Sequence, residues 1–364
     1  MNKLNIIFVD HQRKKAVSGG QVIRERNKEL FKSISNVFID YTYTIRPYSL
    51  GRIRRICGLF NKIEGYKFSD DQNLIRLIRE NNIDLVVFAT SRCGSVSSKI
   101  FKLCKTVTLY HNVEYSYFKQ EQRPQTLKGK INLLRNLRKL KFCERRLTRK
   151  STLLIGLNKR DSDGLKKLYG RGTDYTWPTT FKDCFNKGQK SDSQEKVLLF
   201  VGYNFFGNTD GLFWFIENCL DSIDCKLRVV GNGMDLYKDK YPEKNVEFIG
   251  FVPDLSQEYV NADGVLLPII SGSGMKTKTC EALMYGKKIF GTKEAFEGYS
   301  GIEKTDCVEC NSKKEFIDAI NEFYSGNEKP KKFFESCRNL FLEQYEEKRV
   351  QEKLISYLDC KIAK

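Results

Sequence analysis

Short apolar runs that alternate with helical stretches constrain the fold of this chain more than any other feature of its sequence. In the first half, apolar runs lie at residues 3–10, 83–90 and 106–110. Runs that are apolar on both faces are typical of parallel strands covered by helices on both sides. Helix-like segments lie at about 21–34, 69–81 and 95–104. This alternation predicts a parallel α/β sheet.

The second half repeats the arrangement with apolar runs of its own. They lie at 197–202, 226–231, 246–249, 264–267 and 288–291, with helix-like segments near 209–220, 255–262 and 277–286. We therefore predict an α/β protein with two Rossmann-like parallel-sheet domains facing a central cleft, since ligands of such sheets bind outside the carboxyl ends of the strands. The expected divisions are a first domain at 1–181, a polar linker at 182–196, a second domain at 197–330, and C-terminal helices at 331–364 that cross back to the first domain.

No apolar run approaches the roughly 18–20 residues that span a bilayer. The first residues read as a buried strand and lack the features of a signal peptide, so we expect a cytoplasmic protein. Twelve cysteines are scattered along the chain, which favours free thiols in a reducing compartment over a disulfide scaffold. Cys307 and Cys310 have CxxC spacing, but without a second such pair we interpret them as two thiols near a strand end.

Positive charge is concentrated in the first half of the chain. Residues 1–180 hold 37 Lys and Arg against 15 Asp and Glu, whereas the remainder holds 26 against 30. Such asymmetry indicates an anionic partner for the first half. Residues 127–150 read as a basic amphipathic helix that could lie on an anionic membrane, through Arg138, Lys139 and Lys141. The alternatives are a solvated helix face packed on the first domain and nucleic-acid binding, for which no recognised motif is present.

The loop after the apolar run at 264–267 carries the strongest functional signal. Gly272 and Gly274 allow close backbone approach, and the helix that follows offers unpaired N–H groups and a partial positive charge to a phosphate. Lys276 and Lys278 add full charges beside this loop. Glu281, one turn into the helix, is placed to accept hydrogen bonds from a ribose diol.

This stretch, 246–300, resembles the donor-binding signature of glycosyltransferase family 4, whose members have the GT-B fold. The resemblance also covers nearly all of the rest of the chain, at 200–218, 227–233, Gly19–Gly20, 111–114 and 142–170. It implies a catalytic role for His111, which would reach the transferred sugar or the acceptor. The residues that it implies for donor binding are Gly19, Gly20, Gly202, Phe251, Val252, Gly272, Ser273, Gly274, Met275, Lys276, Thr277 and Glu281.

The chain departs from the family pattern at two places. Ser273 stands where many members carry a glutamate that holds the sugar hydroxyls. Tyr203, Asn204 and then Asn208 follow the strand where many members carry Arg and Lys, so neutralisation of the diphosphate would depend on Lys276, Lys278 and the helix end.

The resemblance implies transfer of a sugar from a UDP- or GDP-sugar to a glycan or a lipid-linked acceptor, with retention of configuration, in cell-surface polysaccharide assembly. Lysines and a helix dipole can stabilise a leaving diphosphate, and no DxD loop is present, so we expect no metal and no other cofactor. The alternatives are a catalytically degenerate GT-B protein that binds nucleotide sugar or membrane, and a GT-B-fold epimerase. His111 could also be a core histidine, and Glu144 could either serve a site or pair with a neighbouring arginine on its helix.

Overall fold

The computed structural model describes residues 4–12, 19–44, 68–121, 126–189, 191, 195–272, 274–326 and 330–362. The chain forms two compact units. Unit 1 comprises residues 1–178 and 353–364, and unit 2 comprises residues 179–352. The second boundary falls inside helix α13 (Glu347–Ile362), so the last residues of the chain belong to unit 1.

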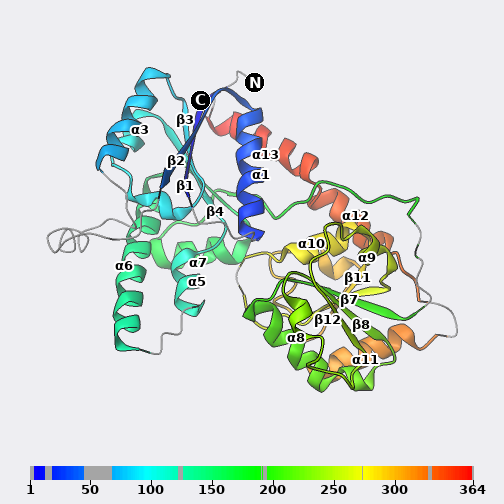
Figure 1. The fold of residues 1–364 in the computed structure, drawn as a ribbon. Coiled ribbons are helices and arrows are strands. Elements are labelled where there is room, and N and C mark those ends of the chain that lie inside the picture. The colour runs from blue at the N-terminus through cyan, green and yellow to red at the C-terminus, as the bar shows by residue number, and fades with distance from the viewer. Residues whose placement is uncertain are drawn as a thin grey trace. The chain divides into compact units, whose positions relative to one another are not determined.

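Unit 1 is a parallel sheet with the strand order β2-β1-β3-β4-β5-β6. The strands are β1 (Leu4–Gln12), β2 (Ser35–Thr44), β3 (Leu85–Phe88), β4 (Lys105–Tyr110), β5 (Leu153–Gly156) and β6 (Tyr175–Thr176). The helices are α1 (Gly19–Ser33), α3 (Phe68–Glu80), α4 (Ile100–Leu103), α5 (Glu114–Glu121), α6 (Leu127–Lys150) and α7 (Lys159–Tyr169), with a 3-10 turn η1 (Ser91–Ser95). Helices cover both faces of the sheet (Figure 1).

The apolar runs identified in the first half of the sequence form the central strands of this sheet. All four residues of β3 are buried, and β1 pairs in parallel with both β2 and β3. Strands β2 and β5 were not predicted. β2 lies at the sheet edge and mixes polar with apolar residues, and the buried apolar run of β5 is only four residues long. The helix expected at 95–104 is wrong in extent, because this segment is divided between the end of η1 and the four-residue α4.

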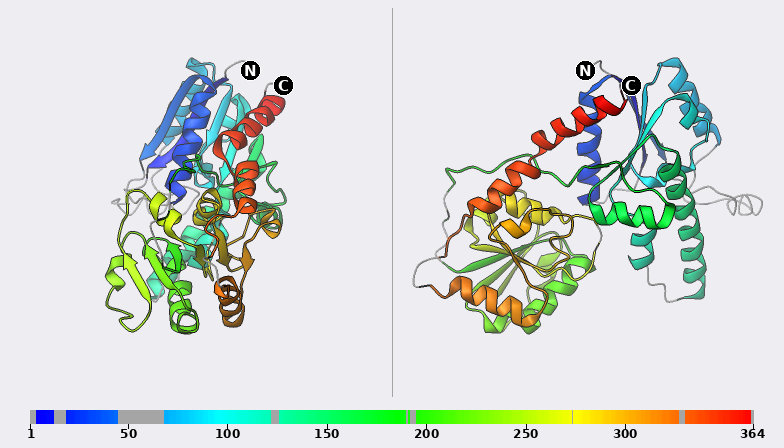
Figure 2. Two further views of the ribbon diagram at one scale, coloured as in Figure 1. Left: turned by 90° about the vertical axis from the view of Figure 1, so that its right-hand side faces the viewer. Right: turned by 180° about the vertical axis from the view of Figure 1, so that it is seen from behind.

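Unit 2 is a second parallel sheet, with the order β12-β11-β10-β7-β8-β9. The strands are β7 (Val197–Val201), β8 (Lys226–Val230), β9 (Val246–Ile249), β10 (Gly264–Leu267), β11 (Lys288–Gly291) and β12 (Val308–Glu309). The helices are α8 (Phe206–Asn218), α9 (Ser256–Asn261), α10 (Thr277–Met284), α11 (Lys313–Tyr324) and α12 (Glu335–Gln344), with 3-10 turns η2 (Leu220–Ser222), η3 (Met234–Tyr237) and η4 (Ile302–Lys304). Figure 2 shows helices on both faces of this sheet as well.

The strand order of unit 2 matches that of dinucleotide-binding Rossmann sheets, in which the order reverses between the first and fourth strands. Here those strands are β7 and β10, which pair with each other at the centre of the sheet. Ligands of such sheets bind at the carboxyl ends of the strands beside this reversal. The loops after β7 and β10 are therefore the expected binding loops of unit 2.

Gly211 allows helix α8 to pack directly on the chain that follows β10. A Cβ atom at this position would lie 1.7 Å from the carbonyl oxygen of Pro268. Because that approach excludes every side chain, only glycine at this position lets α8 lie directly against the loop after β10.

Two six-stranded parallel sheets with flanking helices confirm the predicted α/β class. In the described part of the chain, no helix is long and apolar enough to cross a membrane. Cys310 does not face Cys307, whose sulfur instead lies 3.6 Å from that of Cys337. The Cys310 thiol faces the carbonyl oxygens of Val308 and Glu315.

Candidate active site

The loop between β10 and α10 forms the first part of the candidate site. Gly274 has φ of 65°, a left-handed conformation that favours glycine. Gly272 also lies in this loop, whereas Ser273 lies outside the described residues. Thr277 is the first residue of α10. The Met275 side chain is buried and accepts a hydrogen bond at Sδ from the Thr179 N–H at 3.4 Å, so it supports the loop from inside unit 2.

Lys278 places its ammonium group beside the end of β7. Its Nζ donates to Asn208 Oδ1 at 2.7 Å and lies 4.5 Å from the centre of the Phe200 ring. A Cβ atom on Gly202 would lie only 2.9 Å from this Nζ, so the glycine makes room for the amine. Within the described residues, no carboxylate forms an ion pair with Lys278. Burial, and then the nearby charge of Lys276, lower the Lys278 pKa to about 7.

Asn208 is oriented by its own hydrogen bonds. Its Nδ2 donates to the Tyr203 carbonyl oxygen at 2.8 Å, which leaves Oδ1 to accept from Lys278. The family pattern has Arg and Lys after β7, and this chain lacks them. The Lys278 ammonium from α10, held by Asn208, lies at that place instead. Lys278 was predicted as a charge beside the loop, but its contact with Asn208 has no signal in the sequence.

Lys276 has a different environment from Lys278. Its Nζ forms an ion pair with Glu294 at 2.7 Å and donates to the Gly274 carbonyl oxygen at 3.0 Å. Its charge is therefore already balanced by a carboxylate inside unit 2. Lys278 is the better candidate for an anionic ligand.

Glu281 lies one turn into α10 and is half-buried. Its Oε2 accepts from the Tyr259 hydroxyl at 2.9 Å, and the Tyr259 ring stacks on Tyr285 at 4.7 Å. Burial raises the Glu281 pKa to about 6, while the Tyr259 hydrogen bond and the Lys278 charge oppose that rise. In the described residues, Oε1 of Glu281 has no hydrogen-bond partner. The carboxylate can thus accept from a ligand at neutral pH.

Phe251 and Val252 follow the next strand of the sheet, β9. The Phe251 side chain is 73% exposed, whereas Val252 is half-buried. Both lie after the carboxyl end of β9, the same edge of the sheet that carries Gly202 and the β10 loop. Their position allows contact with a ligand that extends along this edge.

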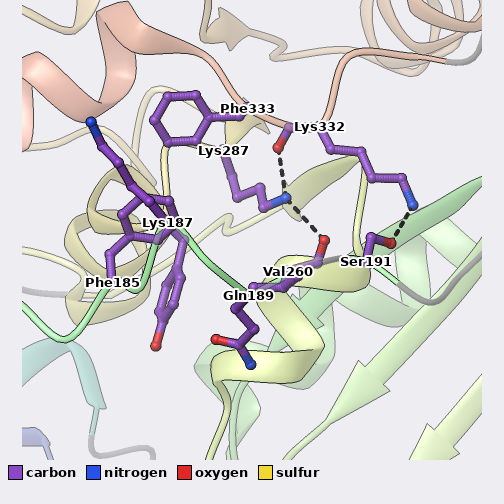
Figure 3. Close-up of a pocket in the computed structure, with 9 residues that line it drawn as sticks. Phe185, Lys187, Gln189, Ser191, Val260, Lys287, Lys332 and Phe333 are labelled. Atoms are coloured by element: carbon purple, nitrogen blue, oxygen red, sulfur yellow. Dashed lines mark hydrogen bonds between the residues drawn. The ribbon is translucent and has the colours of Figure 1, made fainter.

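A cavity of about 390 Å³ in unit 2 lies away from this edge. Val260 precedes β10 and Lys287 precedes β11, so the cavity lies near the amino ends of these strands. Figure 3 shows the Lys287 ammonium between the backbone oxygens of Val260 and Lys332, and the Lys332 ammonium on Ser191. Because the buried Lys287 ammonium and the half-buried Lys332 ammonium already donate to protein oxygens, we assign both to the support of the fold.

His111 follows β4 in unit 1. Its Nε2 lies 3.1 Å from Asn27 Nδ2, on helix α1. Burial, followed by the charges of Arg24 and Arg26, lowers the His111 pKa to about 4, so the imidazole is neutral at physiological pH. Gly19 and Gly20 are the first two residues of α1, where the sequence predicted a loop. Asn27 had no signal in the sequence, because it looks like any polar residue of a helix.

Glu144 of α6 is fully buried, and its carboxylate accepts four hydrogen bonds. The donors are Ser91 Oγ at 3.1 Å, the Glu114 N–H at 2.8 Å, the Tyr115 N–H at 3.3 Å and the Tyr169 hydroxyl at 2.8 Å. Pairing with an arginine of its own helix is therefore wrong. Glu144 instead caps the start of α5, three residues after His111. Burial raises its pKa to about 7.

The membrane-contact candidates lie on α6. Arg138 and Lys141 are exposed and Lys139 is half-buried, while Lys141 Nζ lies 5.4 Å from the centre of the Tyr115 ring. Among the apolar residues of this helix, Leu137 and Leu140 are buried, but Leu127, Ile131 and Leu134 are 75%, 50% and 59% exposed. The start of α6 and the end of α5 point away from the sheet (Figure 1).

Within the described residues, no group of three or more His, Cys, Asp or Glu side chains could hold a metal ion.

Residues 195–325 match the family model described as glycosyl transferases group 1. No curated protein sequence matches the chain significantly. Among solved structures, HepE from Anabaena, in complex with UDP, is 14% identical over 98% of this chain and 100% of its own, with a TM-score of 0.66. A glycosyltransferase from Rickettsia africae is 15% identical over 100% and 99%, with a TM-score of 0.68. WaaG, a glycosyltransferase involved in lipopolysaccharide biosynthesis, is 17% identical over 97% and 99%, with a TM-score of 0.65.

These structures match across both units, so the chain has the fold of GT-B glycosyltransferases. Unit 2 carries the group 1 domain, which contains the candidate site around Lys278 and Glu281. The GT-B fold of the chain and the group 1 domain of unit 2 agree with the predicted class of glycosyltransferase. Membership of family 4 stays a prediction.

Proposed function

We propose that this chain transfers a sugar from a nucleoside diphosphate donor, a UDP- or GDP-sugar, to a glycan or lipid-linked acceptor. The observation that carries the proposal is Lys278, a half-buried amine without an ion-pair partner in the described residues, at the sheet edge where β7 and β10 meet. A buried ammonium group is costly unless an anion balances it. The diphosphate of the donor supplies that anion.

In this proposal the donor lies along the carboxyl edge of the sheet in unit 2. Lys278 and the N–H groups at the start of α10 meet the diphosphate, next to Gly202. Glu281 accepts from the ribose hydroxyls through Oε1, and the backbone of Phe251 and Val252 contacts the base. The Lys278 ammonium and the dipole of α10 stabilise the leaving diphosphate without a metal. His111 of unit 1 contacts the sugar or the acceptor.

The nature of the donor and the acceptor draws support from similar folds. HepE has been crystallised with UDP and with UDP-glucose, and WaaG takes part in lipopolysaccharide biosynthesis. We propose a UDP-sugar as the first donor to test, transfer with retention, and a role in cell-surface polysaccharide assembly on the cytoplasmic side of the membrane.

A thermal-shift screen with UDP, GDP, ADP and their common sugar conjugates, without added metal, tests the donor. A nucleotide at 100 times its dissociation constant should stabilise unit 2 by about 2.7 kcal/mol. A shift with one base, followed by release of that nucleotide on turnover, supports the transferase. Binding without release of nucleotide would instead favour a catalytically degenerate GT-B protein, and interconversion of donor sugars would favour a GT-B-fold epimerase.

Replacing Glu281 with alanine should weaken nucleotide binding by about 1–3 kcal/mol, because the ribose hydroxyls lose their acceptor. Calorimetric titration of the parent and the variant measures this difference. Equal affinities would remove Glu281 from the donor site.

Tyr259→Phe is the matched control, because it keeps the ring stacked on Tyr285 and removes only the hydroxyl. Since that hydroxyl lowers the Glu281 pKa, its loss raises this pKa above about 6. Glu281 accepts hydrogen bonds only as the carboxylate. As the pH is lowered, nucleotide affinity should therefore begin to fall at a higher pH in Tyr259→Phe than in the parent. At pH 8 the two proteins should bind alike.

We also propose that residues 127–143 of α6 rest on an anionic membrane. Leu127, Ile131 and Leu134 offer exposed apolar side chains, and the segment 127–143 contains basic but no acidic residues. Apolar side chains that enter the interface, together with Lys and Arg that meet anionic lipids, are the features of interfacial helices.

Reversing Arg138, Lys139 and Lys141 to glutamate should greatly reduce sedimentation with anionic vesicles in low salt, since each basic residue near the surface contributes about 1 kcal/mol. The control reverses Lys99, Lys102 and Lys166, three exposed lysines of unit 1 outside α6, and makes the same change in net charge. Equal sedimentation of the two triple variants would contradict a specific contact through α6.

A further inference from the structure

Three side chains of unit 1 form a chain of hydrogen bonds that ends on His111. Arg26 donates to Asn27 Oδ1 through Nε at 3.3 Å and through Nη2 at 3.0 Å. The other end of the Asn27 amide, Nδ2, lies 3.1 Å from His111 Nε2. Asn27 is 1% exposed, and the Arg26 guanidinium lies over the Trp177 ring at 4.7 Å. The burial of Asn27 and the contact of Arg26 with Trp177 thus hold these hydrogen-bonded side chains in place.

The direction of each hydrogen bond follows from the chemistry of the groups. A guanidinium only donates, so Asn27 must present its oxygen to Arg26. The amide nitrogen then faces His111 and donates to it. His111 Nε2 must accept that bond, which it can do only when it carries no proton.

We infer that Arg26 and Asn27 fix His111 as the neutral imidazole with its proton on Nδ1, and that this Nδ1–H donates a hydrogen bond to an oxygen of the sugar or the acceptor. In the described residues, Nδ1 has no partner within the protein, so its proton is available to a ligand. Asn27 is a positioning residue, and His111 serves as a hydrogen-bond donor that does not remove a proton. The part that concerns turnover rests on the proposed function, whereas the tautomer does not.

The charged groups around the ring favour the same state. Arg24 and Arg26 of α1 disfavour a positive imidazole, and Asp10 of β1 and Glu114 of α5 oppose them. Burial adds to the effect of the arginines, so the His111 pKa is lowered to about 4. Between pH 5 and pH 8 the ring should therefore stay neutral, and turnover should show no step from its ionisation.

The test is nitrogen NMR of the histidine rings in the full-length protein, which contains two histidines. His111→Gln identifies the His111 signals by their loss. We expect the parent to carry the ring proton on Nδ1. In Asn27→Asp a carboxylate faces the ring, so the proton should move to Nε2 and the His111 pKa should rise by about 1–3 units.

The same variant separates positioning from stability. We expect kcat of Asn27→Asp to fall roughly 10- to 100-fold, since small errors in the placement of a reacting group have effects of this size, while the nucleotide Kd stays unchanged. Asn158→Ala is the control, because it removes the buried cap of α7 in the same unit without touching His111. It should keep the Nδ1–H tautomer and the parental kcat.

A proton on Nε2 in the parent, or an unchanged tautomer in Asn27→Asp, would overturn the inference. A changed tautomer with unchanged kcat would overturn the donor role of Nδ1–H. If the parent turned over no donor sugar, the proposed function would fail, and the NMR result would still decide the tautomer.

Discussion

Replacing Lys278 with methionine should lower the affinity for the nucleoside diphosphate about 30-fold to several thousand-fold, because truncating one partner of a buried charge pair costs about 2–5 kcal/mol. Methionine keeps most of the stem and removes the ammonium group that lies beside Gly202 and Asn208. Calorimetric titration with the nucleotide identified by thermal shift measures the loss.

Lys278→Met should lower the affinity without lowering the stability of the empty protein. In the empty protein the Lys278 pKa is lowered to about 7 from its ordinary value of 10.5, so the folded state disfavours the ammonium. Methionine removes that cost, and the empty variant should unfold at the same temperature as the parent or above it. A variant that lost both stability and affinity would point to a structural role for Lys278.

Lys276→Met is the matched control. Its ammonium is paired with Glu294, and its loss also removes a charge that lowers the Lys278 pKa. The control should therefore bind the nucleotide more tightly than Lys278→Met. The reverse order would favour the interpretation from sequence, in which Lys276 meets the diphosphate.

The lowered pKa of Lys278 predicts how nucleotide binding depends on pH. Above about pH 7 the Lys278 amine is mostly neutral in the empty protein, and an anionic ligand favours its protonated form. Binding at pH 8 should take up a proton, whereas binding at pH 6 should not, and affinity should fall as pH rises above 7. Calorimetric titrations in buffers of different ionisation enthalpy measure how many protons are taken up on binding. Lys278→Met should lack the proton uptake that Lys278 contributes in the parent.

Replacing Glu144 with alanine should lower the free energy of unfolding of unit 1 by about 3–5 kcal/mol, because a buried network loses its acceptor. Four donors, two of them backbone N–H groups at the start of α5, would be left without a partner. Glu144→Gln keeps one carbonyl oxygen at nearly the same volume, so its loss should be clearly smaller.

Urea unfolding followed by tryptophan fluorescence can report on unit 1 alone. Trp177 is buried in unit 1 and Trp214 lies in unit 2, so a Trp214→Phe background leaves a single reporter. A loss below 1 kcal/mol in Glu144→Ala, or equal losses in the alanine and glutamine variants, would contradict the role of the carboxylate as the shared acceptor.

The central strands were predictable because their signal is local. A run such as residues 197–201 is buried on both faces, so its composition alone distinguishes it from a helix or a loop. Strand β2 and the two-residue strands β6 and β12 gave no such signal. The buried run of β5 is only four residues long and was missed as well. β2 lies at an edge of its sheet, and edge positions tolerate polar residues.

Candidate site residues were predictable where a motif is contiguous. The glycines before α10, the lysines beside them and Glu281 follow one another along the chain, so their common place was expected. Their individual roles were not, since Lys276 and Lys278 are two positions apart and alike in sequence. Only the fold pairs one with Glu294 and brings the other to Asn208.

By itself, the sequence of this protein determined two parallel sheets, a glycine-bearing loop with two lysines before α10, and a histidine after β4. Only the tertiary structure decided that Lys278 lies beside Asn208 and Gly202 after β7, that Glu144 caps α5, and that Asn27 faces His111 from 84 residues away. The reason is physical. Secondary structure follows from the local alternation of apolar and polar residues, whereas a hydrogen bond between distant side chains depends on the order in which the strands pair.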